Sequence, residues 1–246
     1  HPAIAGALAE HVEHGTAFFA PTELEIELAE LLRARLPSMQ RVRFCSSGTE
    51  AVLNALRAAR AFTGRGHVAK FEGAYHGIDD PAMISYMPPV DASLGPAHRP
   101  HSVHSSAGLA PGTVESVVVL PLHDADACET ILRENAADLA AVIIDPLSTA
   151  TGLVLPQRAF LDRLRAVTRE LGILLIFDEI VSFRLSMGGT QGAYNIDPDL
   201  TCLAKVIAGG TAGGAFGGRA DVMALYDPTG GPPAIAQSGT YNGNPI

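Results

Sequence analysis

One apolar run constrains the fold of this chain more than any other feature, because it ends in a carboxylate. Residues 173–177 read Ile-Leu-Leu-Ile-Phe, and Asp178 follows directly. Continuous apolar runs of this length are typical of parallel strands that are buried on both faces. A carboxylate at the end of such a strand needs a cationic or hydrogen-bonding partner. The run therefore predicts a buried parallel sheet with a polar site at its carboxyl edge.

Similar runs recur along the chain and are separated by helical patterns. Strands are expected at 41–44, 68–71, 117–120 and 141–144, and helices near 124–137 and 157–171. This alternation predicts an α/β fold with a mostly parallel central sheet flanked by helices, whose ligand lies at the carboxyl ends of the strands. Asp145 and Asp178 both fall there. Residues 81–112, rich in Pro, Gly, Ser and His, are expected to form a long loop over the site or over a subunit interface.

The first 36 residues are predicted to be a helical segment that precedes a large domain at 37–246. Thr22 followed by Glu25 is a capping-box pattern, which is typical of a helix N-terminus. The expected helix runs up to Pro37. It presents one apolar face, formed by Leu24, Leu28, Leu31 and Leu32.

Lys205 is the second unusual charged residue. It lies in the largely apolar stretch 201–210, and Lys70 is the only other lysine. An amine in apolar surroundings is partly neutral, as Schiff-base chemistry requires. Asp178 could instead be a turn or N-cap residue, and Lys205 could extend to solvent. Taken together, a carboxylate and a reactive lysine favour pyridoxal phosphate, whose ring nitrogen takes a carboxylate partner and whose aldehyde condenses with a lysine.

A candidate phosphate site lies near the start of the chain. The expected strand 41–44 runs into Ser47, Gly48 and Thr49, and a helical pattern follows. Small and hydroxyl residues at a helix N-terminus, together with its free backbone N–H groups, suit an anion. The same residues could also be a simple N-cap.

Six motifs in this order resemble those of one known family. They are Ser-Ser-Gly-Thr-Glu-Ala at 46–51, Gly-Ala-Tyr-His-Gly at 73–77, Phe-Asp-Glu-Ile at 177–180, Lys205 followed by Gly-Gly at 209–210, Gly-Ala-Phe-Gly-Gly-Arg at 214–219, and Gly-Thr-Tyr-Asn-Gly-Asn-Pro at 239–245. Together they resemble the class III aminotransferases, which belong to the fold type I pyridoxal phosphate enzymes. The branch they resemble most contains glutamate-1-semialdehyde aminomutase and related amino-acid transaminases. The resemblance runs along the whole chain and implies that 37–246 is the large, cofactor-binding domain.

This resemblance implies a role for each matching residue. Lys205 corresponds to the lysine that forms the Schiff base, and Asp178 to the partner of the pyridine nitrogen. Ser47, Gly48 and Thr49 correspond to the turn that binds the cofactor phosphate.

The remaining matches concern the cofactor ring and the neighbouring subunit. Tyr75 corresponds to an aromatic residue stacked on one face of the ring, and Ile180 to an aliphatic residue on the other face. Thr240 corresponds to a threonine that reaches the phosphate of a neighbouring subunit, which implies a homodimer with shared sites. His76, beside Tyr75, is a second candidate base.

The implied activity is amino transfer between an amino acid or amine and a keto acid. An isomerase of the aminomutase type is one alternative. A non-catalytic cofactor-binding fragment is another, because the family's C-terminal small domain is absent from this chain. The chain departs from the usual family pattern at Asp145, where relatives have glutamate, near Ala150, where the aminomutase branch has asparagine, and at 211–213. These departures leave the substrate class open.

Composition excludes several other functions. A net charge of −9 and the absence of a basic stripe argue against a nucleic-acid partner. No apolar run approaches the ~18 residues of a membrane span, and three cysteines make a disulfide framework unlikely, so a cytoplasmic protein is expected. His98, His101 and His104 lack a cysteine or carboxylate at ligand spacing, so no metal is expected.

Overall fold

The computed structural model describes residues 1–246, apart from the side chain of Ala92, and has the expected α/β architecture. The described residues form one seven-stranded sheet in the order β1-β7-β6-β5-β4-β2-β3. Its strands are β1 (Arg41–Cys45), β2 (His67–Phe71), β3 (Val117–Leu120), β4 (Leu139–Ile144), β5 (Leu174–Asp178), β6 (Leu200–Ala204) and β7 (Gly214–Gly218). Strand β7 runs antiparallel to both of its neighbours, whereas the other pairs are parallel. The mostly parallel sheet predicted from the sequence is confirmed.

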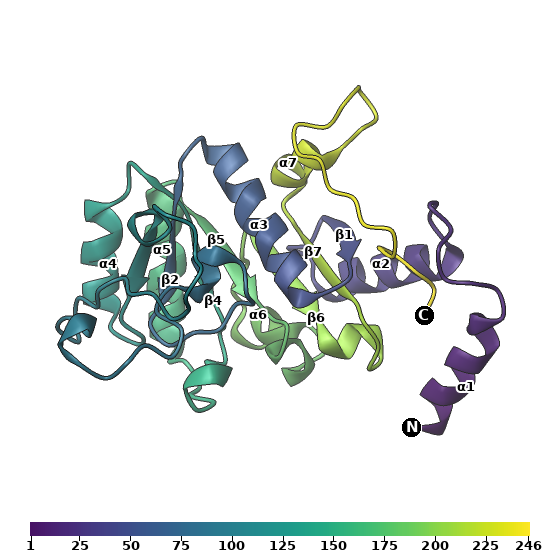
Figure 1. Ribbon diagram of the computed structural model, residues 1–246, viewed down its shortest axis with the longest axis horizontal. Coiled ribbons are helices and arrows are strands. Elements are labelled where there is room, and N and C mark those ends of the chain that lie inside the picture. The colour runs from purple at the N-terminus through teal and green to yellow at the C-terminus, as the bar shows by residue number, and fades with distance from the viewer.

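Helices cover both faces of the sheet (Figure 1). The helices are α1 (Pro2–Val12), α2 (Glu23–Arg35), α3 (Gly48–Thr63), α4 (Ala125–Glu134), α5 (Arg158–Glu170), α6 (Gly189–Tyr194) and α7 (Ala220–Met223). Helices α3 and α7 contribute to one hydrophobic cluster, and α4 and α5 to another on the opposite face. Strand β4 alternates between the clusters, with Ile143 in the first and Val142 in the second. Burial on both faces explains why this strand reads as a continuous apolar run.

Chain direction brings the ends of several strands to one edge of the sheet. Asp178 ends β5 and pairs in register with Cys202 of β6, so Lys205 lies three residues beyond the point where β6 passes Asp178. Strand β1 is antiparallel to β7, and β7 is antiparallel to β6, so β1 points the same way as β6. The turn that begins α3 after Cys45 therefore lies at the edge where Asp178 and Lys205 lie.

Asp199 fixes the opposite edge of these strands. Its carboxylate accepts from Arg165 Nη1 at 2.6 Å, from Arg219 Nη1 at 3.0 Å and from the Leu175 backbone N–H at 2.8 Å. The side chain of Asp199 is buried, and two guanidinium groups offset the cost of its desolvation. This network holds together the starts of β5 and β6 and the end of the antiparallel β7.

The N-terminal segment agrees only in part with its sequence pattern. Thr22 caps α2 as expected, because its Oγ1 accepts from the Glu25 N–H at 3.2 Å. Leu32 is buried against the sheet, but Leu24 and Leu31 are 37% and 48% exposed, so the expected apolar face is only partly covered. Helix α1 buries no residue and projects from the end of the molecule where the C-terminus also lies (Figure 1). The division of the chain at residue 37 stays a prediction.

The segment 81–112 is largely irregular, as expected, and contains two short 3-10 turns, Asp80–Met83 and Ala92–Leu94. Within the described part of the chain, no helix is both long and apolar enough to cross a membrane.

Candidate functional site

A cavity of about 340 Å³ opens at the carboxyl edge of the sheet. All but one of the predicted site residues line it, namely Ser47, Gly48, Thr49, Tyr75, Asp178, Ile180 and Lys205. These residues come from the loops after β1, β2, β5 and β6. Their convergence agrees with the general rule that ligands of parallel sheets bind at the carboxyl ends of the strands.

Asp178 is the buried carboxylate of this cavity, at 4% exposure. Its Oδ1 accepts from the Ile180 N–H at 3.1 Å, and its Oδ2 lies 2.7 Å from His76 Nδ1. An ionised carboxylate only accepts hydrogen bonds, so Nδ1 carries the proton of this contact. His76 is therefore the side chain that provides the hydrogen-bonding partner expected for Asp178. Because His76 is 1% exposed and committed to Asp178, it supports that carboxylate and does not act as a separate base.

The N-terminus of α3 forms one wall of the cavity. Ser47 is its N-cap, and the Ser47 Oγ accepts from the Glu50 N–H at 3.2 Å. Gly48 and Thr49 are the first helical residues, and N–H groups at this position have no partner within the helix. Those groups and the helix dipole favour a bound anion. The N-cap interpretation and the anion-site interpretation of Ser47 are thus compatible.

Close packing shapes this wall. A Cβ atom on Gly77, whose φ is +92°, would meet Thr49 Oγ1 at 2.7 Å and Thr49 Cα at 2.9 Å. A Cβ atom on Gly48 would meet Ile180 Cδ1 at 2.6 Å. The loop after β2 therefore lies directly against the start of α3, and this contact requires glycine at 77.

Lys205 begins the short 3-10 helix Lys205–Ala208 directly after β6. Its φ is +49°, a left-handed conformation that non-glycine residues seldom adopt and that often marks a functional site. The expectation that apolar residues enclose Lys205 is wrong for this chain, because the side chain is exposed and Val206 is 43% exposed. The physical reason is that the chain leaves the sheet at Lys205, so that Lys205 and Val206 face solvent while Ile207 packs back against the core.

Tyr75 and Ile180 line the cavity from different segments. Tyr75 is 40% exposed, and its ring centroid lies 4.9 Å from that of Tyr86. Ile180 is 8% exposed and belongs to the core. Their placement on opposite faces of a cofactor ring stays a prediction.

Thr240 lies outside the lining of this cavity. It is exposed, in a turn whose Asn242 Oδ1 accepts from Ser46 Oγ at 3.3 Å and whose Gly243 packs on Glu25. The turn is thus held next to the start of α3 of its own chain, and the predicted contact of Thr240 with a neighbouring subunit stays a prediction.

The segments that depart from the family pattern also line the cavity. Asp145 and Thr149 contribute to one wall and residues 211–213 to another. Asp145 Oδ2 accepts from the Thr149 N–H at 2.8 Å, so this carboxylate orders its own loop. Thr149 was not predicted as a lining residue, and the available signal was its position in the loop that follows the buried strand β4.

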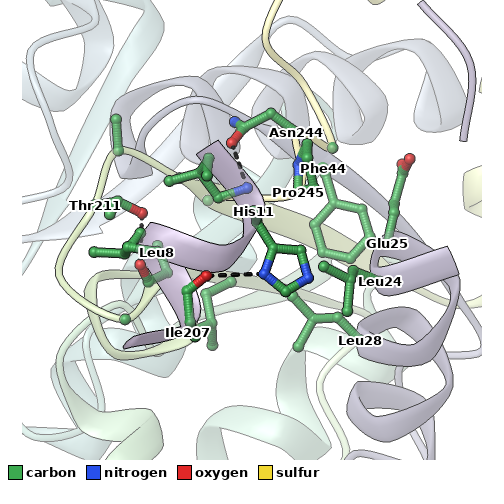
Figure 2. A pocket seen from close by; sticks show the side chains of 18 of the residues that line it. Leu8, His11, Leu24, Glu25, Leu28, Phe44, Ile207, Thr211, Asn244 and Pro245 are labelled. Carbon is green, nitrogen blue, oxygen red and sulfur yellow. Dashed lines mark hydrogen bonds between the residues drawn. The ribbon is translucent and has the colours of Figure 1, made fainter. Parts of the chain in front are cut away.

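A larger cavity, of about 460 Å³, shares residues 211–213 with the first cavity but contains none of the predicted site residues (Figure 2). His11 of α1 faces Leu24 and Leu28 of α2 there, with Phe44 beside them, and Leu8 of α1 lies on the side of Ile207 and Thr211. Its walls are mainly aliphatic and contain neither Asp178 nor Lys205. We therefore assign the chemistry to the smaller cavity.

The close contact between Gly77 and Thr49 predicts what a methyl group added at position 77 would do. Gly77→Ala should lower the free energy of unfolding by about 1–2 kcal/mol for the left-handed backbone and by about 1–3 kcal/mol more for overpacking against Thr49. Displacement of Thr49 should also weaken the binding of pyridoxal phosphate. Urea unfolding and a cofactor titration measure the two effects.

Gly64→Ala is the matched control for this prediction. Gly64 has a φ of +71° at the other end of α3 and has nothing within 4 Å of its Cβ position. This variant should show the backbone cost alone and bind the cofactor normally. Equal cofactor affinity in the two variants would contradict the role assigned to the Gly77 contact.

Known proteins similar to this chain identify its family. The model of the class III aminotransferase family matches residues 1–246. A glutamate-1-semialdehyde 2,1-aminomutase of Roseiflexus castenholzii is 47% identical over 100% of this chain and 54% of its own length. The chain thus spans about half the length of the curated relatives it matches.

Two solved structures agree with this comparison. An omega-transaminase from Sphaerobacter thermophilus superposes with a TM-score of 0.95 at 47% identity, covering 100% of this chain and 56% of that one. A glutamate-1-semialdehyde-aminomutase from Pseudomonas aeruginosa PAO1 gives a TM-score of 0.83 at 29% identity, covering 99% and 53%. The chain belongs to the class III aminotransferase family.

Proposed function

We propose that this chain is the cofactor-binding domain of an aminotransferase that uses pyridoxal phosphate to move an amino group between an amino acid or amine and a keto acid. One observation carries the proposal: a buried carboxylate, a lysine and a helix N-terminus line the same cavity. Each matches a different part of this cofactor. The family depends on pyridoxal phosphate, and a related transaminase structure has it bound.

The residues of the cavity fit the cofactor. The first turn of α3, with Ser47 and Thr49, suits the phosphate. Asp178 has two hydrogen-bonding partners, and a carboxylate has capacity for about four, so it can still accept from a protonated ring nitrogen. Tyr75 and Ile180 would contact the ring. When bound, pyridoxal phosphate supplies an aldehyde that condenses with amines and a ring that accepts the electrons of a carbanion.

With the cofactor bound, three side chains of this chain would each have a different role. Lys205 Nζ would hold the aldehyde covalently and, when an incoming amine takes its place, would be free to accept a proton from the substrate carbon. Asp178 would keep the ring nitrogen protonated by accepting its hydrogen bond. His76 donates to the other side of this carboxylate and holds it in place.

Two observations favour a transaminase over an aminomutase. The fold superposes more closely on the omega-transaminase than on the aminomutase, with TM-scores of 0.95 and 0.83. In addition, the chain lacks the asparagine that the aminomutase branch has near Ala150, and Asp145 and Thr149 of the same segment line the cavity, as do residues 211–213. The aminomutase activity remains the second candidate, because a curated relative of that name is 47% identical. A cytoplasmic location accords with three free, buried cysteines.

A donor and acceptor screen tests this function. The purified protein is loaded with pyridoxal phosphate, and absorbance follows conversion between the aldehyde and amine forms of the cofactor. We expect an amino donor to convert the first form to the second, and a keto acid to reverse the change. Rearrangement of glutamate-1-semialdehyde without any external acceptor would instead identify an aminomutase. Cofactor that stays bound and never converts would identify a non-catalytic domain.

We also propose that the chain forms a homodimer in which Thr240 binds the phosphate of the neighbouring site. The exposed position of Thr240 outside its own cavity and the nearby Ser46–Asn242 contact support this proposal. A lost hydrogen bond to a charged group costs about 1.5–3 kcal/mol, so Thr240→Ala should weaken cofactor binding about tenfold to a hundredfold. Cofactor affinity should also fall as the protein is diluted below its dimer dissociation constant.

Mixed variants sharpen this test. Thr240→Ala and Lys205→Ala subunits, when combined, should form hybrid dimers in which one site carries both changes and the other neither. Thr229→Ala is a control for hydroxyl loss, because Thr229 lies in another exposed turn and its Oγ1 bonds to Asp227. A monomer that binds the cofactor equally well at every dilution would contradict shared sites.

A further inference from the structure

Lys70 is a fully buried lysine that the proposed chemistry does not use. It lies in β2, with Val119 of β3 and Ile143 of β4 as its neighbours in register, and is 1% exposed. Its Nζ donates to the carbonyl of Ala74 at 2.9 Å and to that of Ile84 at 2.5 Å. Both acceptors are backbone groups.

Burial of this amine is costly. Desolvation lowers the pKa of Lys70 to about 7. The strands around it are apolar, so a leucine or methionine would fill the space without that cost. An apolar side chain would, however, leave the buried carbonyls of Ala74 and Ile84 without this donor. The two carbonyls that Lys70 binds therefore explain why an amine is buried at this position.

The two acceptors mark the ends of one excursion of the chain. The backbone leaves β2, passes through 74–84 and returns, and the Gly73 N–H donates to Ser85 O at 2.8 Å across its base. Lys70 links the two ends of this excursion, because its amine donates to the carbonyl of Ala74 at one end and of Ile84 at the other.

Three consecutive residues at the start of this excursion build the cavity. Tyr75 lines it, His76 Nδ1 lies 2.7 Å from Asp178 Oδ2, and Gly77 packs on Thr49. Ala74, which Lys70 binds, directly precedes them. A shift of the Ala74 carbonyl would thus move the ring contact, the carboxylate partner and the wall of the anion site together.

We propose that Lys70 is a positioning residue for the cavity: its amine ties Ala74 to Ile84 and so fixes Tyr75 and His76 against Asp178. The consequence for cofactor binding rests on the proposed function, whereas the consequence for the segment 73–85 does not. The two can therefore be tested apart.

Lys70→Met tests the proposal, because it retains most of the alkyl chain and removes the donors. Hydrogen exchange followed by mass spectrometry is measured on the chain without cofactor. Exchange in peptides covering 73–85 should rise about tenfold or more, as expected for lost hydrogen bonds. In the presence of pyridoxal phosphate, the variant should bind more weakly and show a shifted absorbance band for the bound cofactor.

Leu132→Ala is the matched control. Leu132 is fully buried in α4 and forms no part of the Lys70 hydrogen bonds, so its loss destabilises the fold while leaving both of those bonds in place. This control should leave exchange in 73–85 and the cofactor spectrum unchanged under native conditions. Lys70→Gln, with a shorter donor, provides a second variant if Lys70→Met folds poorly.

Unchanged exchange at 73–85 in a folded Lys70 variant would overturn the proposal. Loss of folding in both Lys70 variants would also overturn it, because the amine would then serve the whole core. If the wild-type chain bound no pyridoxal phosphate while exchange still rose in Lys70→Met, the proposed function would fail and the clamping of 73–85 would stand.

Discussion

The hydrogen bond between His76 and the buried Asp178 carboxylate is the interaction on which the site depends. A carboxylate at 4% exposure requires donors, and the fold provides them from the Ile180 backbone and from the loop after β2. Bringing His76 to Asp178 requires that loop to cross the strand ends, where Gly77 packs on Thr49. The need of the buried Asp178 carboxylate for hydrogen-bond donors thereby brings together β5, the loop after β2 and the start of α3.

Strand direction accounts for the remaining geometry. Because β1, β5 and β6 point the same way, the start of α3, Asp178 and Lys205 all lie at one edge of the sheet. The buried network of Asp199 with Arg165 and Arg219 fixes the other ends of β5, β6 and β7. The buried ion pairs of Asp199 thus lie at one edge of the sheet, and the candidate site lies at the other, where Lys205 has a left-handed backbone conformation.

The sequence predicted the parts that follow from local pattern. Apolar runs located β2 to β5, and the motifs located seven residues that do line the cavity. Strand β7 was missed because Gly-Ala-Phe-Gly-Gly has little strand propensity and pairs only through close backbone approach. The surroundings of Lys205 were predicted wrongly, since apolar neighbours in sequence do not show where a chain leaves its sheet. The His76 contact with Asp178 joins residues 102 apart and has no local signal.

The central claim is that Lys205, and not the buried Lys70, binds pyridoxal phosphate. The chain has only these two lysines, so covalent labelling gives a clear answer. The protein is incubated with pyridoxal phosphate, reduced with borohydride, digested and mapped by mass spectrometry, with Lys205→Ala as the control. We expect a pyridoxyl group on Lys205 and no labelled lysine in the control. A label on Lys70, or equal labelling of the control, would contradict this claim.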